Sequence, residues 1–247
     1  MPTMLGPLIG AGVVITAGTA AYHSMAPWSQ GFGRTFVGGH VGSKQIALTY
    51  DDGPNDPHTL RLMEVLAKNG VRATFFLIGR YVETRPDIVR DVLKAGHVIG
   101  NHTFTHPLLA VRSAAKTREE LESCQHAIEN ATGESPKLFR PPFGSRRPHT
   151  LRIARALELE PIMWNVTSGD WKMPPAAKVV QTCNRHIHGG DVILMHDGSH
   201  VAMGADRWQT VIATHLLIEQ WREKKYEFVT IPKMMESVVS HQPPVAG

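Results

Sequence analysis

Short apolar runs alternate with longer amphipathic stretches from residue 45 onward, and this alternation constrains the fold most strongly. Short runs rich in β-branched and aromatic residues are typical of buried strands, whereas longer stretches with apolar side chains at helical spacing are typical of helices. Consecutive β-α units of this kind form a parallel sheet. The expected strands are Gln45–Tyr50, Ala73–Ile78, His97–Gly100, Leu138–Arg140, Pro161–Val166, Asp191–His196 and Phe228–Ile231.

The stretches between these strands carry the periodicity of helices. In residues 208–224, Val211, Ile218 and Trp221 recur at helical spacing and charged residues close the segment, as expected of a helix that covers a sheet. Parallel strands with outer helices predict an α/β fold in one domain, a (β/α)7-type barrel. The other expected helices lie near residues 58–69, 85–95, 117–131, 147–158 and 176–188.

Chemically capable side chains follow the apolar runs directly. In barrels of parallel strands the functional groups gather at the carboxyl ends of the strands, so these side chains are predicted to form one site. They are Asp51 and Asp52 after the first strand, Asn101, His102 and His106 after the third, Arg140 at the fourth, Asp170 and Trp171 after the fifth, and His196 and Asp197 at the sixth.

Adjacent carboxylates on an extended strand point to opposite sides, so Asp51 and Asp52 are expected to have different roles, and Gly53-Pro54 is expected to supply a turn. One carboxylate can bind a metal while the other accepts a proton from a metal-activated water. An Asx turn or a helix cap is the structural alternative for this segment.

Two imidazoles, those of His102 and His106, are four residues apart, so a helical turn or a tight loop brings them to the same side. With 14 histidines in the chain such a pair also arises by chance. The histidine pair follows the expected strand His97–Gly100, which should lie near the first strand and its two aspartates. This position favours a metal site of two imidazoles and one carboxylate, with coordination positions left open.

Two further segments bring groups suited to acyl transfer. Arg140 can hold an aspartate ionised, and the proline-fixed loop after it can direct the backbone N–H of Phe143 at an oxyanion. Asp170 can orient and charge the imidazole of His196, which then donates a proton to a departing amine. A surface ion pair, a core tryptophan and a strand-capping histidine are the structural alternatives.

Five segments together resemble the NodB-homology polysaccharide deacetylases, the carbohydrate esterase family that removes N-acetyl groups from chitin-like or peptidoglycan sugars. The likeness covers about residues 44–232, and the first segment departs from the usual pattern only in having Tyr50 where phenylalanine is frequent. The five segments, in the order of the family's motifs, are Thr49–Pro54, His102–His106, Arg140–Phe143, Ser168–Trp171 and Leu194–His196.

The resemblance implies a distorted barrel, an amino-sugar glycan as substrate, and one divalent metal ion, with Zn²⁺ as the first choice and Co²⁺, Ni²⁺ or Mn²⁺ as alternatives. It also implies the roles of single residues. Asp51 is the general base, Asp52, His102 and His106 are the metal ligands, Arg140 orients Asp51, Asp170 tunes the general acid His196, Phe143 donates its backbone N–H to the oxyanion, and Trp171 and Leu194 line the acetyl pocket.

Charge and cysteine content exclude some other classes. The 26 basic and 22 acidic residues give a net charge of +4, without the basic, aromatic-rich cluster expected of a nucleic-acid-binding protein. Cys124 and Cys183 lack metal-binding spacing and are expected to be buried thiols in helices. No protein partner is indicated.

The first 33 residues carry no charged side chain, and Leu5–Ala21 is an apolar run rich in Gly, Ala, Val and Ile. An uncleaved membrane anchor, a cleaved export signal and a helix packed on the domain all fit this run. We therefore divide the chain into an N-terminal segment with linker, residues 1–35, and a catalytic domain, residues 36–247. The family resemblance implies export, so the expected location is the cell envelope, anchored or secreted, with the cytoplasmic face left open.

Three rival functions are also compatible with the sequence. A deformylase or deacetylase of a lipid-linked sugar would suit the apolar N-terminus. A non-haem iron oxygenase also uses two histidines and one carboxylate, although its acid usually lies close to the first histidine, whereas Asp52 precedes both. A non-catalytic sugar-binding protein could keep the fold, but every motif position is intact.

Overall fold

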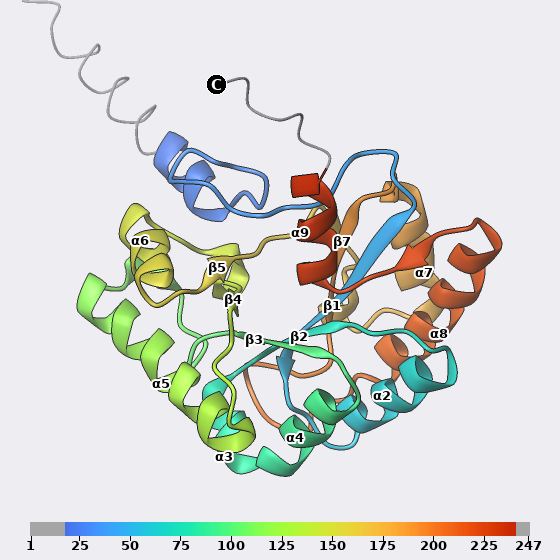
Figure 1. Ribbon diagram of the computed structural model, residues 1–247, viewed down its shortest axis with the longest axis horizontal. Coiled ribbons are helices and arrows are strands. Elements are labelled where there is room, and N and C mark those ends of the chain that lie inside the picture. Colours follow the sequence, from blue (N-terminus) through green and yellow to red (C-terminus); the bar gives the residue numbers. More distant parts are fainter. Residues whose placement is uncertain (1–17, 241–247) are drawn as a thin grey trace, which may run out of the picture.

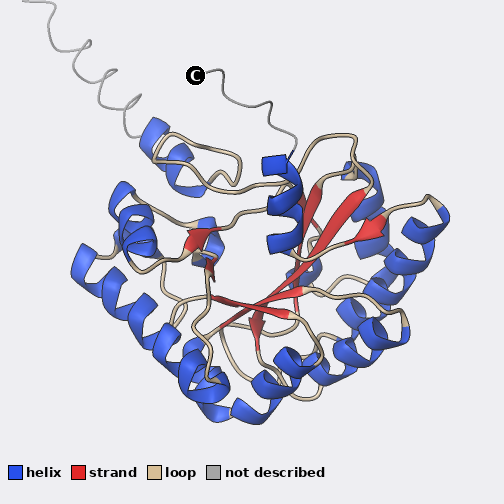
Figure 2. Ribbon diagram, in the orientation of Figure 1, coloured by secondary structure: helices blue, strands red, loops and turns tan. Residues whose placement is uncertain are grey.

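A computed structural model describes residues 18–240, in which eight strands form one curled, parallel sheet with helices around its outside (Figures 1 and 2). The order of pairing is β5-β4-β3-β2-β1-β7-β6, and β8 pairs with the start of β1. The predicted α/β barrel is confirmed in its distorted, open form. The strands are β1 (Gln45–Gly53), β2 (Thr74–Leu77), β3 (Val98–Asn101), β4 (Leu138–Phe139), β5 (Glu160–Pro161), β6 (Val166–Thr167), β7 (Asp191–His196) and β8 (Glu227–Phe228).

Each expected helix is present, and α3 and α9 are two further helices that were not expected. The segment expected as one helix over 85–95 belongs to α4, and a separate α3 precedes it, because Pro86 cannot continue the preceding helix but is well suited to begin a new one. Cys124 in α5 and Cys183 in α7 are buried free thiols, as expected. The helices are α2 (His58–Lys68), α3 (Gly79–Thr84), α4 (Pro86–Lys94), α5 (Ala114–Thr132), α6 (Pro148–Ala156), α7 (Ala176–His186), α8 (Trp208–Glu223) and α9 (Ile231–Ser240).

Alternation along the strands separates two cores and positions the site. In β1, Ile46, Leu48 and Tyr50 pack against the outer helices, whereas Ala47 belongs to a smaller cluster inside the barrel. By the same period of two, Asp51 lies on the inner side at the carboxyl end of the strand. Asp51 therefore lies just beyond the apolar cluster inside the barrel, at the carboxyl ends of the strands.

The strand expected over Pro161–Val166 is wrong as a single element. β5 and β6 lie at opposite ends of the pairing order, because the residues between them bond elsewhere. Ile162 bridges Phe36, whereas Asn165 bonds Val192 of β7 twice, through its backbone N–H and through its side-chain oxygen. The last expected strand, Phe228–Ile231, is also too long, because Ile231 and Pro232 already begin α9.

Residues 18–36 lie against the domain beside α6 (Figure 1). The buried guanidinium of Arg146 donates to the backbone oxygens of Ala26 and Ser29 at 2.7 and 2.8 Å. No helix within residues 18–240 is long and apolar enough to cross a bilayer. Most of the apolar run Leu5–Ala21 lies outside the described residues, and the boundary at residue 35 stays a prediction.

Candidate active site

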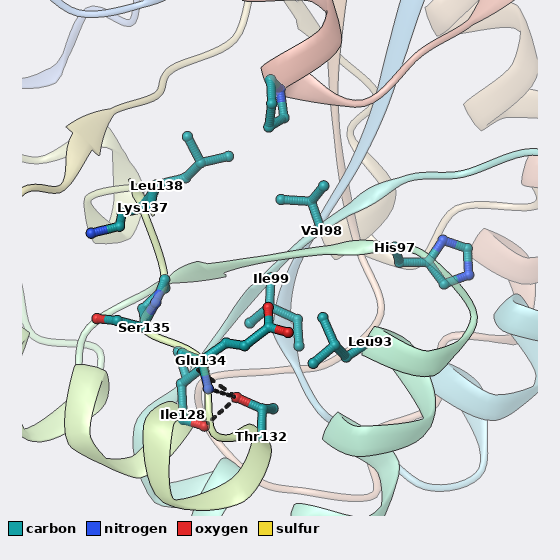
Figure 3. Close-up of a pocket in the computed structure, with 12 residues that line it drawn as sticks. Leu93, His97, Val98, Ile99, Ile128, Thr132, Glu134, Ser135, Lys137 and Leu138 are labelled. Atoms are coloured by element: carbon teal, nitrogen blue, oxygen red, sulfur yellow. Dashed lines mark hydrogen bonds between the residues drawn. The ribbon is translucent and has the colours of Figure 1, made fainter.

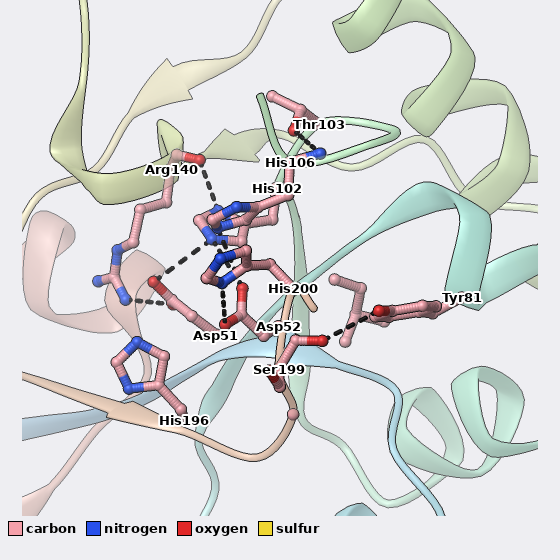
Figure 4. Close-up of polar contacts among 12 residues, drawn as sticks. Asp51, Asp52, Tyr81, His102, Thr103, His106, Arg140, His196, Ser199 and His200 are labelled. Carbon is pink, nitrogen blue, oxygen red and sulfur yellow. Dashed lines mark hydrogen bonds and ion pairs between the residues drawn. The ribbon is translucent and has the colours of Figure 1, made fainter. Parts of the chain in front are cut away.

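A pocket of about 420 Å³ opens at the carboxyl ends of the strands, where the sequence places the site (Figure 4). Arg140 and Asp170 lie behind its wall, each bonded to a residue that lines it. The structure thus brings the predicted site residues together except Asn101 and Asp197, whose side chains bond Leu121 and Thr59 instead of lining the pocket. The predicted residues that line the pocket are Asp51, Asp52, His102, His106, Phe143, Trp171, Leu194 and His196.

The backbone of Asp52 explains how two adjacent carboxylates reach one pocket. Strand β1 continues to Gly53, but Asp52 has a left-handed φ of 73° and the pairing with β2 shifts register between Asp51 and Gly53. The turn expected at Gly53-Pro54 thus already begins at Asp52. Asp51 Oδ2 lies 3.7 Å, and Asp52 Oδ1 3.5 Å, from the same Nε2 of His102.

A tight loop, not a helical turn, carries the two imidazoles. Thr103 and His106 both have positive φ, 66° and 61°, which turns the loop back on itself. The buried carboxylate of Glu120 in α5 fixes it by accepting hydrogen bonds from the backbone N–H groups of Phe104 and Thr105 and from the hydroxyl of Thr105. Glu120 thus sets the loop that presents His102 and His106.

Asp52, His102 and His106 form a buried group whose ligand atoms all lie within 4.8 Å of one another. The carbonyl oxygen of Arg140 lies 2.7 Å from Nδ1 of His102 and can only accept, so Nδ1 donates to it and Nε2 is the nitrogen left to bind a cation. Nε2 faces Asp52 Oδ1, a buried atom without a hydrogen bond in the described chain. A carboxylate opposite a ring nitrogen of histidine fits a cation between them.

The protonation states of this group also suit a cation. Burial opposes ionisation of Asp52, but the imidazoles of His102, His106 and His200 outweigh burial and lower the pKa of Asp52 well below its ordinary value. Burial lowers the pKa of His106, although Asp52 opposes this. Metal ligands must be deprotonated carboxylate and neutral imidazole, which is the state that these shifts favour.

Arg140 forms an ion pair with Asp51 on the side of the carboxylate that faces away from the pocket. Its side chain is fully buried, and it donates to Asp51 Oδ1 and to the hydroxyl of Thr49, both at 2.7 Å, and to the carbonyl oxygen of Met163 at 3.1 Å. Burial lowers the pKa of Arg140, and the Asp51 carboxylate opposes that shift. The guanidinium also lies over the ring of Phe76, 4.1 Å from its centroid. These contacts fix one oxygen of Asp51 and leave the other facing the pocket.

Asp170 and His196 form a second polar pair on the other side of the pocket. Asp170 accepts hydrogen bonds from Nδ1 of His196 at 2.8 Å and from the hydroxyls of Ser168 and Thr210. Although burial alone would lower it, Asp170 raises the pKa of His196 to about 9. With Nδ1 donating to Asp170, Nε2 of His196 is the nitrogen left for the pocket.

Three residues predicted to contact substrate lie at the pocket wall. Phe143 has φ 58°, and its ring packs edge-on against His106 at a centroid distance of 4.6 Å. Trp171 packs edge-on over His196 at 5.6 Å and is partly exposed, whereas Leu194 is buried. Their roles toward an acyl group and an oxyanion stay predictions.

The sequence profile described as polysaccharide deacetylase matches residues 38–162. A peptidoglycan-N-acetylglucosamine deacetylase of Bacillus cereus is 32% identical over 212 residues, 85% of this chain and 74% of the relative. The chain belongs to the polysaccharide deacetylase family. A chitooligosaccharide deacetylase of a Bradyrhizobium species is also 32% identical to this polysaccharide deacetylase, over 78% of this chain and 91% of the relative.

Among solved structures, a pseudoenzyme of carbohydrate esterase family 4 from Bacillus anthracis superposes on this polysaccharide deacetylase with a TM-score of 0.76. It is 31% identical, over 83% of this chain and 69% of that chain. A mutant of that pseudoenzyme is described as having restored enzymatic activity. Likeness of fold therefore does not establish turnover in this family, and the site residues themselves have to carry that inference.

Sequence reasoning missed several residues of this polysaccharide deacetylase site. The ring of His200 stacks on that of His106 at 4.5 Å, and its Nδ1 lies 3.8 Å from Asp52 Oδ2. Arg80 and Tyr81 hold the loop of His200 by donating to the backbone oxygens of His200 and Ser199. The four-residue spacing of His196 and His200 was the available signal in the sequence.

A second cavity of about 250 Å³ lies at the amino-terminal ends of β3 and β4, away from the site (Figure 3). It is lined mostly by apolar side chains such as Leu93 and Ile128. Nδ1 of its buried His97 accepts a hydrogen bond from the backbone N–H of Ala73, and burial, aided by Arg72, lowers the pKa of His97 to about 4. This histidine is neutral and structural, so the cavity offers no comparable chemistry.

Proposed function

We propose that this polysaccharide deacetylase removes N-acetyl groups from an amino-sugar glycan, either peptidoglycan or a chitin-type oligosaccharide, and releases acetate. One observation carries the proposal. The Asp51–Arg140 pair and the His196–Asp170 pair flank the Asp52–His102–His106 group around a single pocket. The activities for which the Bacillus cereus and Bradyrhizobium relatives are named support the choice of substrate class.

Asp51 acts as the general base in this proposal. Arg140 binds Oδ1, so Oδ2 is the atom left to take a proton from the water that attacks the acetyl carbonyl carbon. The buried guanidinium keeps that carboxylate in place without closing the side that faces the pocket. Nε2 of His102, 3.7 Å away, lies on the same side.

His196 acts as the general acid. Its pKa of about 9 keeps it protonated at neutral pH, and Asp170 fixes its orientation through Nδ1. The proton at Nε2 goes to the amide nitrogen as its bond to the acetyl carbon breaks, so that the sugar leaves as an amine and the acetyl group as acetate.

Asp52, His102 and His106 would hold one divalent cation, and two imidazoles with one carboxylate fit zinc, with cobalt, nickel and manganese as alternatives. Such an ion, when bound, polarises a carbonyl oxygen and lowers the pKa of a water. Around it, Trp171 and Leu194 enclose the acetyl group, and the backbone N–H of Phe143 faces the developing oxyanion.

Release of acetate tests this function directly. The full chain is incubated with N-acetylglucosamine oligomers and with isolated peptidoglycan, before chelation, after chelation, and after return of zinc. We expect acetate release that chelation abolishes and zinc restores. His196→Ala should retain zinc and lose most turnover, whereas the exposed His215→Ala should behave as wild type.

No acetate from either glycan under any metal condition would contradict the proposal and favour a non-catalytic sugar-binding protein. Release of formate from a lipid-linked amino sugar, without acetate from the soluble oligomers, would favour the deformylase alternative.

A further inference from the structure

Three segments without a single aspartate or glutamate meet on one side of the molecule, although the chain has 22 acidic residues. They are residues 18–36, 105–118 and 137–157. Figure 1 shows the first of them beside α6, which belongs to the third. The backbone N–H of Ala110 donates to the hydroxyl of Ser145 and so joins the second to the third.

Exposed arginines gather where these segments meet, in particular on α6. Arg152 and Arg155 lie one turn apart on its exposed side, and Arg155 donates to the backbone oxygen of Arg34. Burial and the charges of Arg147 and Arg152 lower the pKa of His149 between them. The exposed arginines are Arg34, Arg112, Arg147, Arg152 and Arg155, and none of them forms an ion pair with any residue from 18 to 240.

Neighbouring acids do not neutralise these arginines. The exposed carboxylates of Glu119 and Glu122 in α5 are already paired with Lys116 and Arg118, and that of Glu158 after α6 with Lys137. The charge on this side is therefore a net positive one, which attracts anionic surfaces and is weakened by salt.

Large apolar side chains are exposed on the same segments. Trp28 is 62% exposed and donates its indole N–H to the hydroxyl of Tyr22, and Met25 is exposed between them in the sequence. Val111, next to Arg112, is 70% exposed. Aromatic side chains beside basic ones are the combination that favours the boundary between lipid headgroups and acyl chains.

These side chains are held in place. Arg146 fixes the backbone at Ala26 and Ser29, and its own backbone N–H donates to the oxygen of Ser24. The same loop carries Phe143 of the active site three residues earlier. The position of residues 22–29 is thus coupled to the rim of the pocket.

We propose that this arginine face docks on an anionic phospholipid bilayer. We define it as Tyr22, Met25, Trp28 and Val111 together with Arg34, Arg112, Arg147, Arg152 and Arg155. A soluble polyanion would account for the arginines but not for the exposed tryptophan, methionine and valine. The apolar run Leu5–Ala21 directly precedes Tyr22 in the sequence, which also favours lipid. Docking there places the pocket beside the membrane surface, where glycan near a bilayer can be reached.

Vesicle flotation of the full chain tests this docking. Vesicles of phosphatidylcholine alone are compared with equal mixtures of phosphatidylglycerol and phosphatidylcholine, at low and high NaCl. We expect the mixed vesicles to bind more protein, and salt to remove the difference. The triple variant Arg147→Glu, Arg152→Glu, Arg155→Glu should partition roughly a hundred-fold less onto the mixed vesicles, as the loss of three basic contacts predicts.

A matched control carries the same change in charge on the other side of the barrel. Lys68→Glu, Lys178→Glu and Arg185→Glu alter exposed residues of α2 and α7, and this variant should keep most of the binding. Trp28→Ser should weaken binding to mixed vesicles at both salt concentrations, because it removes an apolar contact. Circular dichroism and thermal unfolding show that each variant is folded.

Three results would overturn the proposal. They are equal binding of the wild type to both kinds of vesicle, unchanged binding of the folded Arg147, Arg152 and Arg155 variant, and retention of the wild type on immobilised heparin without any binding to mixed vesicles. The last result would assign the face to a soluble polyanion.

Discussion

Asp170 Oδ1 lies 2.8 Å from Nδ1 of His196. Asp170 Oδ2 accepts a hydrogen bond from the backbone N–H of His196 at 2.7 Å. One carboxylate therefore fixes both the ring and the backbone of His196. Because the ion pair stabilises the charged imidazole, the pKa of His196 is raised to about 9 despite burial.

Asp170→Asn should move the alkaline limb of the pH–rate profile to lower pH. Without the negative charge, burial dominates and the pKa of His196 falls, so the acid is deprotonated at pH values where the wild type is active. Thr210→Val, which removes a different hydrogen bond to Asp170, is the control and should shift the limb much less. An unchanged limb in Asp170→Asn would contradict the role of His196 as the acid.

The same ion pair predicts how stability depends on pH. The pKa of His196 is raised on folding, so its contribution is fully present below the ordinary value of 6.5 and is lost as pH rises through about 9. Urea unfolding of wild type and Asp170→Asn at pH 6 and pH 10 should therefore differ more at the lower pH. An equal difference at both would show that the pair adds no charge-dependent stability.

Arg140→Met should destabilise the protein and abolish turnover. It leaves the buried Asp51 without its cation and frees the hydroxyl of Thr49, and loss of one member of a buried ion pair costs about 3 to 5 kcal/mol. Urea unfolding measures this cost. The exposed Arg118→Met, whose partner Glu122 is also exposed, should cost less than about 1 kcal/mol. Comparable losses in both variants would refute the account of Arg140.

Glu120→Gln should weaken zinc binding although Glu120 is not a proposed ligand. An amide cannot accept all the hydrogen bonds that Glu120 accepts from the loop of His102 and His106, and loss of such supporting contacts lowers metal affinity about 10- to 100-fold. Competition with a chromophoric chelator measures the affinity. Glu119→Gln, one residue earlier and exposed, is the matched control. Equal zinc affinities of wild type and Glu120→Gln would show that the loop keeps its conformation without the carboxylate of Glu120.

His200→Ala should lower kcat/KM for glycan while zinc affinity stays that of wild type. The ring of His200 covers His106 at the pocket wall but does not belong to the group of ligand atoms. We expect a loss of about tenfold in kcat/KM, the size of one lost contact in the transition state. A large fall in zinc affinity would instead make His200 a ligand.

The sequence was sufficient to predict the barrel and the meeting of the site residues. Both follow from local rules, because strands alternate their faces and the carboxyl ends of parallel strands meet at one edge, which places Asp51, Arg140 and His196 together. The disposition of the metal ligands was predicted only in outline, because a left-handed residue at Asp52 decides it.

Features that depend on distant contacts were not predictable. The expected strand over 161–166 divides because Asn165 bonds β7 through its backbone and its side chain, at the opposite end of the pairing order from β5. Glu120 supports a loop 15 residues away in sequence. Neither residue stands in a motif. His200 reaches the site only because Arg80 and Tyr81 hold its loop, which a local pattern does not reveal.

Metal content and acetate release of Asp51→Asn and Asp52→Asn, measured side by side, test the division of labour between the two carboxylates most directly. Asp51→Asn should bind one zinc ion per chain and release almost no acetate, whereas Asp52→Asn should lose both zinc and turnover. Wild-type acetate release by Asp51→Asn, or wild-type zinc affinity in Asp52→Asn, would contradict the assignment of Asp51 as base and Asp52 as ligand.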